Sequence, residues 1–129
     1  MSNTALYETT NDPGQQLTWL ENKLIEARAN DKTVIIAGNM HPGSPICNRQ
    51  WSHRYSALID AYQDIVRIQL FGGSDDEEFE IYRNVDSGNP IAVASIASPF
   101  NPYKRDMSAN LIDVDVNSKF PIKIKTYSY

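Results

Sequence analysis

The spacing of apolar residues near the start of the chain predicts an amphipathic helix. Apolar side chains recur there at intervals of three and four residues, at Leu17, Leu20, Leu24 and Ala27. Asp12 can cap the helix, Pro13 suits the first helical turn, and Gln15 completes a spacing like that of a capping box. We therefore expect a helix from Pro13 to about Ala29.

The next segments predict an alternation of strand and helix. Residues 33–37 form a short continuous apolar run, which is typical of a buried parallel strand. Residues 38–50 hold two prolines and two glycines, so we expect a loop there. A second helix is expected over residues 51–62 and a second strand over residues 65–71. The side chains that this helix should bury are Tyr55, Leu58, Ile59 and Tyr62.

In the second half of the chain the apolar period shortens to two residues. Residues 79–81 and 91–97 are interpreted as two strands joined by a turn at 86–89. Residues 111–116 and 122–127 alternate apolar and polar side chains and predict a terminal hairpin with one solvated face. The fold class expected is α/β, a β-α-β-α-β section followed by antiparallel strands. The aromatic residues expected in the core are Tyr62, Phe71, Phe79 and Tyr82.

Length and charge exclude some classes of protein. A chain of 129 residues is expected to form a single domain over 1–129. The net charge of −4 argues against a broad nucleic-acid surface, which needs clustered lysine and arginine. We therefore expect no nucleic-acid partner. No apolar segment is long enough to span a membrane, so we also expect no transmembrane segment.

Cysteine content bears on the compartment. Cys47 is the single cysteine, so neither an intrachain disulfide nor a cysteine-based zinc site is expected. The opening Met-Ser-Asn-Thr shows no secretory signal. Together these features favour a reducing compartment.

A few residue groups could carry chemistry, and each has a plainer interpretation. The acidic run 75–78 offers the carboxylate oxygens that calcium prefers, although its spacing is not that of an EF-hand and consecutive acids usually form a solvated turn. His41 and His53 lie twelve residues apart without a cysteine or acidic partner at metal-ligand spacing. Cys47 could act as a nucleophile with either histidine, but a loop thiol is the simpler interpretation.

A set of longer motifs is more specific. Residues 71–80 read Phe-Gly-Gly-Ser-Asp-Asp-Glu-Glu-Phe-Glu, and residues 34–43 read Val-Ile-Ile-Ala-Gly-Asn-Met-His-Pro-Gly. They resemble Phe-Gly-His-Thr-His-x-Asp-Glu-Phe-Glu and Ile-Ile-Gly-His-Ile-Pro-Pro-Gly of the acid-sphingomyelinase-like phosphodiesterases, which are calcineurin-like metallophosphoesterases. Residues 3–21 are similar to a passage in the middle of that domain, and Pro99 and Tyr103 fit its Pro-x-x-x-Pro-Tyr passage.

The resemblance implies a two-metal centre whose histidines are replaced in this chain. The positions of three metal-binding histidines in that family are occupied by Asn39, Gly73 and Asp75. The other ligands of the family lie in an N-terminal half, so the resemblance predicts that the chain corresponds to the C-terminal half. Because glycine has no side-chain ligand and an amide oxygen is a weak one, we expect no metal, no cofactor and no catalytic residue. His41 and Trp51 would remain as a residual pocket.

The favoured hypothesis is a catalytically inactive, truncated relative of these phosphodiesterases that acts as a binding or structural component of an assembly. The alternative is a metal-dependent phosphodiester hydrolase whose site is completed by a partner chain or by relocated ligands. A third hypothesis is a gene remnant without a selected role. Half of a sandwich would expose an apolar sheet face, so a homo-oligomer or a covering partner chain is expected. The resembling family is mostly secreted or lysosomal, in contrast to the compartment favoured above.

Overall fold

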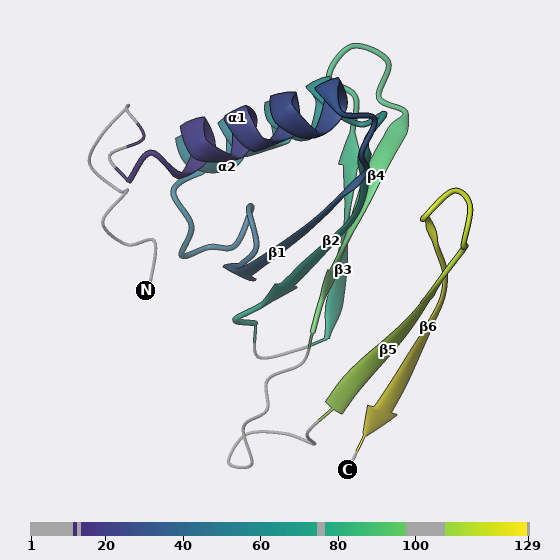
Figure 1. The fold of residues 1–129 in the computed structure, drawn as a ribbon. Coiled ribbons are helices and arrows are strands. Elements are labelled where there is room, and N and C mark those ends of the chain that lie inside the picture. Colours follow the sequence, from purple (N-terminus) through teal and green to yellow (C-terminus); the bar gives the residue numbers. More distant parts are fainter. Residues whose placement is uncertain (1–11, 13, 75–76, 98–107, 129) are drawn as a thin grey trace.

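The computed structural model of the chain describes residues 12, 14–74, 77–97 and 108–128. These residues form a mixed α/β fold, which confirms the fold class expected from the sequence (Figure 1). The elements, in chain order, are α1 (Gln16–Ala29), β1 (Val34–Met40), α2 (Arg49–Ala61), β2 (Val66–Gly72), β3 (Glu78–Arg83), β4 (Pro90–Ile96), β5 (Ser108–Val114) and β6 (Pro121–Ser128).

Helix α1 begins at Gln16, so the predicted start at Pro13, a residue outside the described ranges, is wrong by three residues. Asp12 nevertheless caps the helix, because its carboxylate accepts the backbone N–H groups of Gln16 at 3.0 Å and Leu17 at 2.8 Å. Gln15 lies between Asp12 and the start of the helix and has a φ of 51°. This left-handed residue turns the chain so that the carboxylate of Asp12 reaches the first helical turn.

The main sheet has four strands in the order β1-β2-β4-β3. Strands β1, β2 and β4 are parallel, and β3 pairs antiparallel with β4 through the predicted turn. The prediction that the first strand is buried is wrong, because β1 is an edge strand and its Ile35 is 56% exposed. A continuous apolar run does not reveal whether another element covers its outer face.

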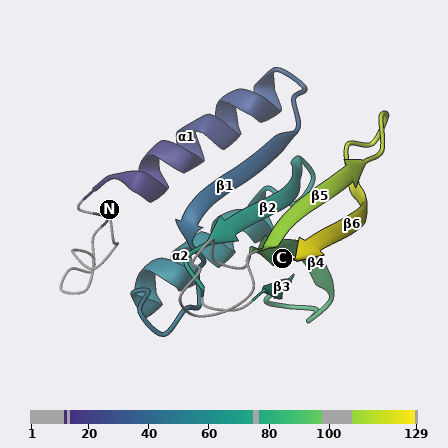
Figure 2. The ribbon, with the colours of Figure 1, turned by 90° about the horizontal axis from the view of Figure 1, so that it is seen from below.

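Both helices pack on the same face of this sheet, and the β5–β6 hairpin lies on the opposite side (Figures 1 and 2). The helix-side core joins α1, α2, β2, β3 and β4 through residues that include Leu17, Leu24, Tyr55, Ile59, Phe71, Tyr82, Ala94 and Ile96. Tyr62 is buried as expected, but Phe79 is 73% exposed. The prediction of Phe79 in the core is therefore wrong, because its neighbour Tyr82 occupies the inward face of β3.

The predicted terminal hairpin is confirmed, and two polar contacts connect it to the sheet. The guanidinium of Arg67 donates a hydrogen bond of 2.9 Å to the carbonyl of Ser118 and lies 4.5 Å from the centre of the Phe120 ring. Thr126 donates a hydrogen bond of 2.8 Å to the Glu77 carboxylate. The hairpin is thus held against the face of the sheet that the helices leave free.

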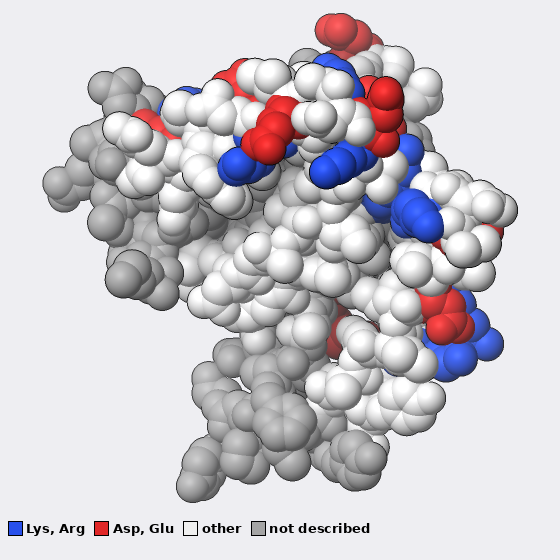
Figure 3. All heavy atoms as spheres, viewed as in Figure 1, with Lys and Arg blue, Asp and Glu red and all other residues white. Residues whose placement is uncertain are grey.

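Neither described helix is both long enough and apolar enough to cross a membrane. Charged side chains in the view of Figure 3 gather along α1 and around the hairpin, whereas the surface over β1 is uncharged.

Candidate functional site

The ends of β1 and β2 bring together two of the positions that the resemblance predicts to be former metal-ligand positions. Asn39 is the penultimate residue of β1 and Gly73 follows β2 directly, and the two strands are parallel neighbours. Gly73 has a φ of +77°, and a Cβ placed on it would lie 2.9 Å from the backbone oxygen of Asn39. The same Cβ would lie 3.5 Å from the Asn39 side-chain oxygen. The third position, Asp75, lies outside the described residues.

This pair does not fit the two-metal group that the resemblance implies. Such a centre needs imidazoles and carboxylates at fixed geometry, and here an amide oxygen faces a glycine backbone. In the described part of the chain, no three His, Cys, Asp or Glu side chains gather closely enough to hold a metal ion. No catalytic step through a metal therefore follows from these residues.

The described end of the acidic run makes separate local contacts. The Glu77 carboxylate accepts from Thr126 on β6, whereas the Glu78 carboxylate accepts a hydrogen bond of 2.9 Å from Ser74. The remaining acids, at 75 and 76, lie outside the described residues. The two described carboxylates thus act as acceptors between segments of the chain.

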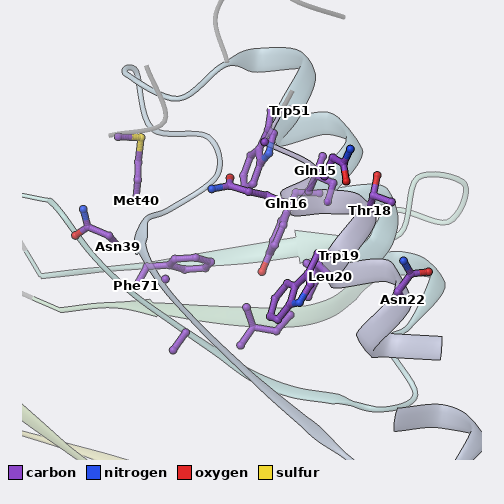
Figure 4. Close-up of a pocket in the computed structure, with 16 residues that line it drawn as sticks. Gln15, Gln16, Thr18, Trp19, Leu20, Asn22, Asn39, Met40, Trp51 and Phe71 are labelled. Atoms are coloured by element: carbon purple, nitrogen blue, oxygen red, sulfur yellow. The ribbon is translucent and has the colours of Figure 1, made fainter. Parts of the chain in front are cut away.

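A pocket of about 730 Å³ opens beside Asn39, between the N-terminal turns of the two helices and the carboxyl end of β1. We call it the α1–β1 pocket, and Figure 4 shows the residues that line it. Asn39 and Trp51 line it, as do Gln16, Trp19 and Phe71. Trp51, predicted as part of a residual pocket, lies here, while His41 is not among the lining residues.

Packing around Trp51 and Phe71 forms the inner wall of this pocket. The Trp51 and Tyr55 rings are stacked with centres 5.5 Å apart and an interplanar angle of 14°. Phe71 lies so close to β1 that a Cβ on Gly38 would come within 2.8 Å of its ring. Gly38 therefore allows the Phe71 ring to reach the pocket. In the figure, the Gln16 side chain lies between Trp51 and Phe71 (Figure 4).

A second, smaller pocket of about 470 Å³ lies at the other side of α2, and Glu80 lines it. Burial raises the pKa of the Glu80 carboxyl, and the Tyr82 hydroxyl and the charge of His41 oppose that rise. Tyr82 donates to the carboxylate at 3.2 Å, and burial together with the Glu80 charge raises the pKa of the Tyr82 hydroxyl. His41 thus belongs electrostatically to this region.

Cys47 also lines the smaller pocket and is buried. Its sulfur lies 3.4 Å from the Ser52 hydroxyl. His53 lines the same pocket, and among the described residues neither histidine has a hydrogen bond to the thiol. The recorded hydrogen bond of the thiol is therefore with a hydroxyl group, and the interpretation of Cys47 as a loop thiol stays a prediction.

Sequence reasoning missed Glu80, Gln16 and Trp19. Glu80 is two residues from the buried Tyr82 on β3, so both side chains lie on the inward face of the strand. The two-residue alternation of side chains along a strand could have indicated this position for Glu80. Gln16 and Trp19 lie three residues apart on α1, about one helical turn, and both line the pocket. Their spacing on a helix gave no signal, because the approach of α1 to β1 is a tertiary feature.

Comparison with known proteins gives similarity to sphingomyelin phosphodiesterases. The chain is 32% identical over 93 residues to the human sphingomyelin phosphodiesterase, a match that covers 71% of this chain and 14% of that protein. It is 30% identical over 116 residues to human acid sphingomyelinase-like phosphodiesterase 3b, covering 79% of this chain and 25% of that protein. With sphingomyelin phosphodiesterase B of Dictyostelium discoideum it shares 23% identity over 133 residues, 97% of this chain and 21% of that protein.

No protein-family model matches the chain. The matches span between 14% and 25% of the length of these three relatives. The similarity is therefore to a part of each relative.

Proposed function

We propose that this chain is a catalytically inactive relative of the acid-sphingomyelinase-like phosphodiesterases. Its similarity to sphingomyelin phosphodiesterases supports a common origin with that family. The resemblance of the segments around Asn39 and Gly73 predicts that both residues replace metal-binding histidines of that family. Inactivity of the chain is expected because neither residue supplies an imidazole.

One observation carries this proposal, namely the fit of the Gly73 backbone against β1. A side chain at this position would meet the Asn39 backbone oxygen at 2.9 Å, closer than nearly all real Cβ contacts. The positive φ of Gly73 adds a conformational cost for any residue other than glycine. The loop after β2 has therefore adopted a conformation in which a metal-binding side chain does not fit.

The phosphodiesterase proposal is tested by hydrolysis of bis(4-nitrophenyl) phosphate with added zinc, manganese or iron(II). We expect no turnover above a protein-free blank with the purified chain. Turnover that EDTA abolishes would overturn the proposal. The alternative is tested by the same assay on the protein isolated from its native source with its bound partners. EDTA-sensitive turnover in that sample, but not with the purified chain, would indicate a site completed by a partner chain.

We further propose that the chain acts as a binding or structural component of an assembly. The support is the sheet face opposite the helices, where apolar side chains remain exposed beside the hairpin. Ile81 pairs with Val93 across β3 and β4, and both are exposed next to Phe79. Ile35 is exposed on the same face of β1, because the adjacent Ile36 packs against the helix-side core. A second copy or a partner chain would remove these side chains from water.

A further inference from the structure

Strand β1 has the composition of an internal strand but lies at an edge of the sheet. Its sequence, Val-Ile-Ile-Ala-Gly-Asn-Met, contains neither a charged residue nor a proline. Among the described strands only β4 likewise lacks a charged residue, and β4 is paired on both sides. No other described strand pairs with the outer edge of β1. Its composition therefore fits a strand that gains a second neighbour.

The other described edge strands, β3, β5 and β6, all carry charge. An exposed strand edge is a template for pairing with another chain, and charged side chains or proline on the edge normally prevent this. The charged residues on these three strands are Glu78, Glu80, Arg83, Asp113, Lys123 and Lys125. Among the edges that the structure describes, β1 alone lacks this protection.

The backbone of β1 offers hydrogen-bonding groups on its outer side. The N–H of Val34 donates to the carbonyl of Ile65, the residue before β2, at 2.9 Å. Backbone groups of successive strand residues point to alternate sides, and residues 35–38 pair with β2 in a regular register. The N–H and C=O groups of Ile35 and Ala37 therefore point away from β2. Both residues are exposed, so a further strand could reach these groups.

The α1–β1 pocket shows that this edge is open among the described residues. Residues 36–40 of β1 line it in unbroken order, although successive strand residues point to opposite faces of a sheet. Such a run can line one pocket only along the edge of the strand. Trp19 of α1 lines the same pocket and is 62% exposed, so an added strand would also remove an aromatic ring from water.

Charge indicates which chain can approach this edge. The protein has a net charge of −4, so two copies repel each other where their acidic surfaces meet. The surface over β1 is uncharged, and the described residues that line the pocket beside it include no charged side chain (Figure 3). Two copies can therefore meet at β1 without bringing like charges together.

Symmetry determines how two such strands would pair. Identical surfaces form a closed pair when a two-fold axis relates them, and an axis perpendicular to the sheet places two edge strands antiparallel. In an antiparallel pair, opposite residues exchange both of their hydrogen bonds. Ile35 of one copy can then lie opposite Ala37 of the other, so that the outward groups of both residues are satisfied.

We infer that β1 pairs antiparallel with β1 of a second copy and joins the two main sheets into one continuous sheet. This pairing rests on the proposed assembly role and deepens it, because it names the partner and the strand that binds it. The open sheet face around Phe79 is a separate contact, since Phe79 lies on β3 at the opposite edge of the sheet.

Disulfide cross-linking tests this pairing directly. Cys47, the single cysteine, is first replaced by serine. Chains with Ile35→Cys are then mixed with chains that carry Ala37→Cys, and the mixture is oxidised. We expect disulfide-linked dimers in higher yield than from Val85→Cys, whose cysteine would lie in the exposed turn between β3 and β4. A yield equal to that of this control would overturn the inference.

A charge placed on the edge gives an independent test by sedimentation velocity. Ala37→Lys adds a cation at an exposed position of β1 and should weaken dimerisation by about tenfold or more. Ala57→Lys makes the same change at an exposed position of α2 and should dimerise as the wild type does.

The same measurements separate this pairing from the contact through the open sheet face. Phe79→Ser should leave the cross-link between the β1 strands in place. Association that Phe79→Ser removes and Ala37→Lys does not would overturn the pairing of β1 and leave the assembly role standing. A wild-type chain that stays monomeric at every concentration would contradict both.

Discussion

Gly73 determines what the loop after β2 can hold. Its backbone has a φ of +77° and approaches Asn39 so closely that a Cβ would sit 2.9 Å from a backbone oxygen. A backbone oxygen cannot rotate away as a flexible side chain can. The position identified by resemblance as a lost ligand is therefore also a position where the present conformation requires glycine.

We predict that Gly73→Ala destabilises the fold by about 2–4 kcal/mol, the sum of a left-handed backbone cost and the close contact. Gly88 is a matched control, because its φ is +69° but nothing lies within 4 Å of its added Cβ. Gly88→Ala should therefore cost only about 1–2 kcal/mol. Urea unfolding of both variants measures the difference, and equal costs would show that the contact with Asn39 is not tight.

On strand β3 the charged and aromatic side chains divide between two faces. Tyr82 and Glu80 point toward α2, whereas Phe79 and Ile81 point to the face without helices. The inward face thus carries a half-buried carboxyl group in place of an apolar side chain. Since burial raises its pKa, the charged form of Glu80 is disfavoured in the folded chain.

This arrangement predicts a pH-dependent stability. A carboxyl with a raised pKa contributes most stability below its unfolded pKa of about 4.3, and that contribution is lost as the pH rises through the folded value. Glu80→Gln should therefore gain stability relative to the wild type as the pH rises from 4 toward 7. Urea unfolding at several pH values measures this difference.

The Tyr82 hydroxyl lowers the pKa of Glu80, so the folded-state pKa of Glu80 should be higher in Tyr82→Phe. The stability of this variant should therefore continue to fall up to a higher pH than that of the wild type. A difference between Glu80→Gln and the wild type that stays constant from pH 4 to 7 would contradict the account of β3.

The spacing of apolar residues and the turn-forming residues predicted the helices and strands well, but predicted less well which faces of the strands are buried. Both helices, the turn between β3 and β4 and the terminal hairpin occur close to where the sequence places them. The apolar run of β1 predicted a parallel strand correctly, but not that it lies at the edge of the sheet. The sequence predicted both Phe79 and Tyr82 in the core, but the two side chains lie on opposite faces of β3 and only Tyr82 joins the core.

The candidate site was predictable only in part, since it depends on how elements approach one another. Sequence motifs identified Asn39, Gly73 and Trp51, and the structure places Asn39 beside Gly73 and Trp51 in the same pocket as Asn39. The contribution of α1 to that pocket follows from helix packing, which no local pattern records. The role of Asp75 stays a prediction, because it lies outside the described residues.

Across the whole molecule, the sheet has one face under two helices and one face only partly under a hairpin. Two hydrogen bonds and one ring contact, from Arg67 and Glu77, connect that hairpin to the sheet. Apolar side chains of β1, β3 and β4 remain exposed beside it. An exposed surface of this kind normally marks a contact with another chain.

We predict that the chain associates through this face at micromolar concentration and that Phe79→Ser weakens the association by about tenfold or more. Val85→Ser is the matched control, because Val85 is 80% exposed but lies in the turn between β3 and β4. Sedimentation velocity over a range of concentrations measures both variants. A wild-type monomer at every concentration, without a co-purifying partner, would contradict the assembly role.

The most direct test of the central proposal, that the ends of β1 and β2 form no metal centre, is calorimetric titration of the purified chain with zinc and manganese. We predict no site with a dissociation constant below about 0.1 mM. One or two sites per chain with dissociation constants near or below about 1 μM, weakened by Asn39→Ala, would contradict the account.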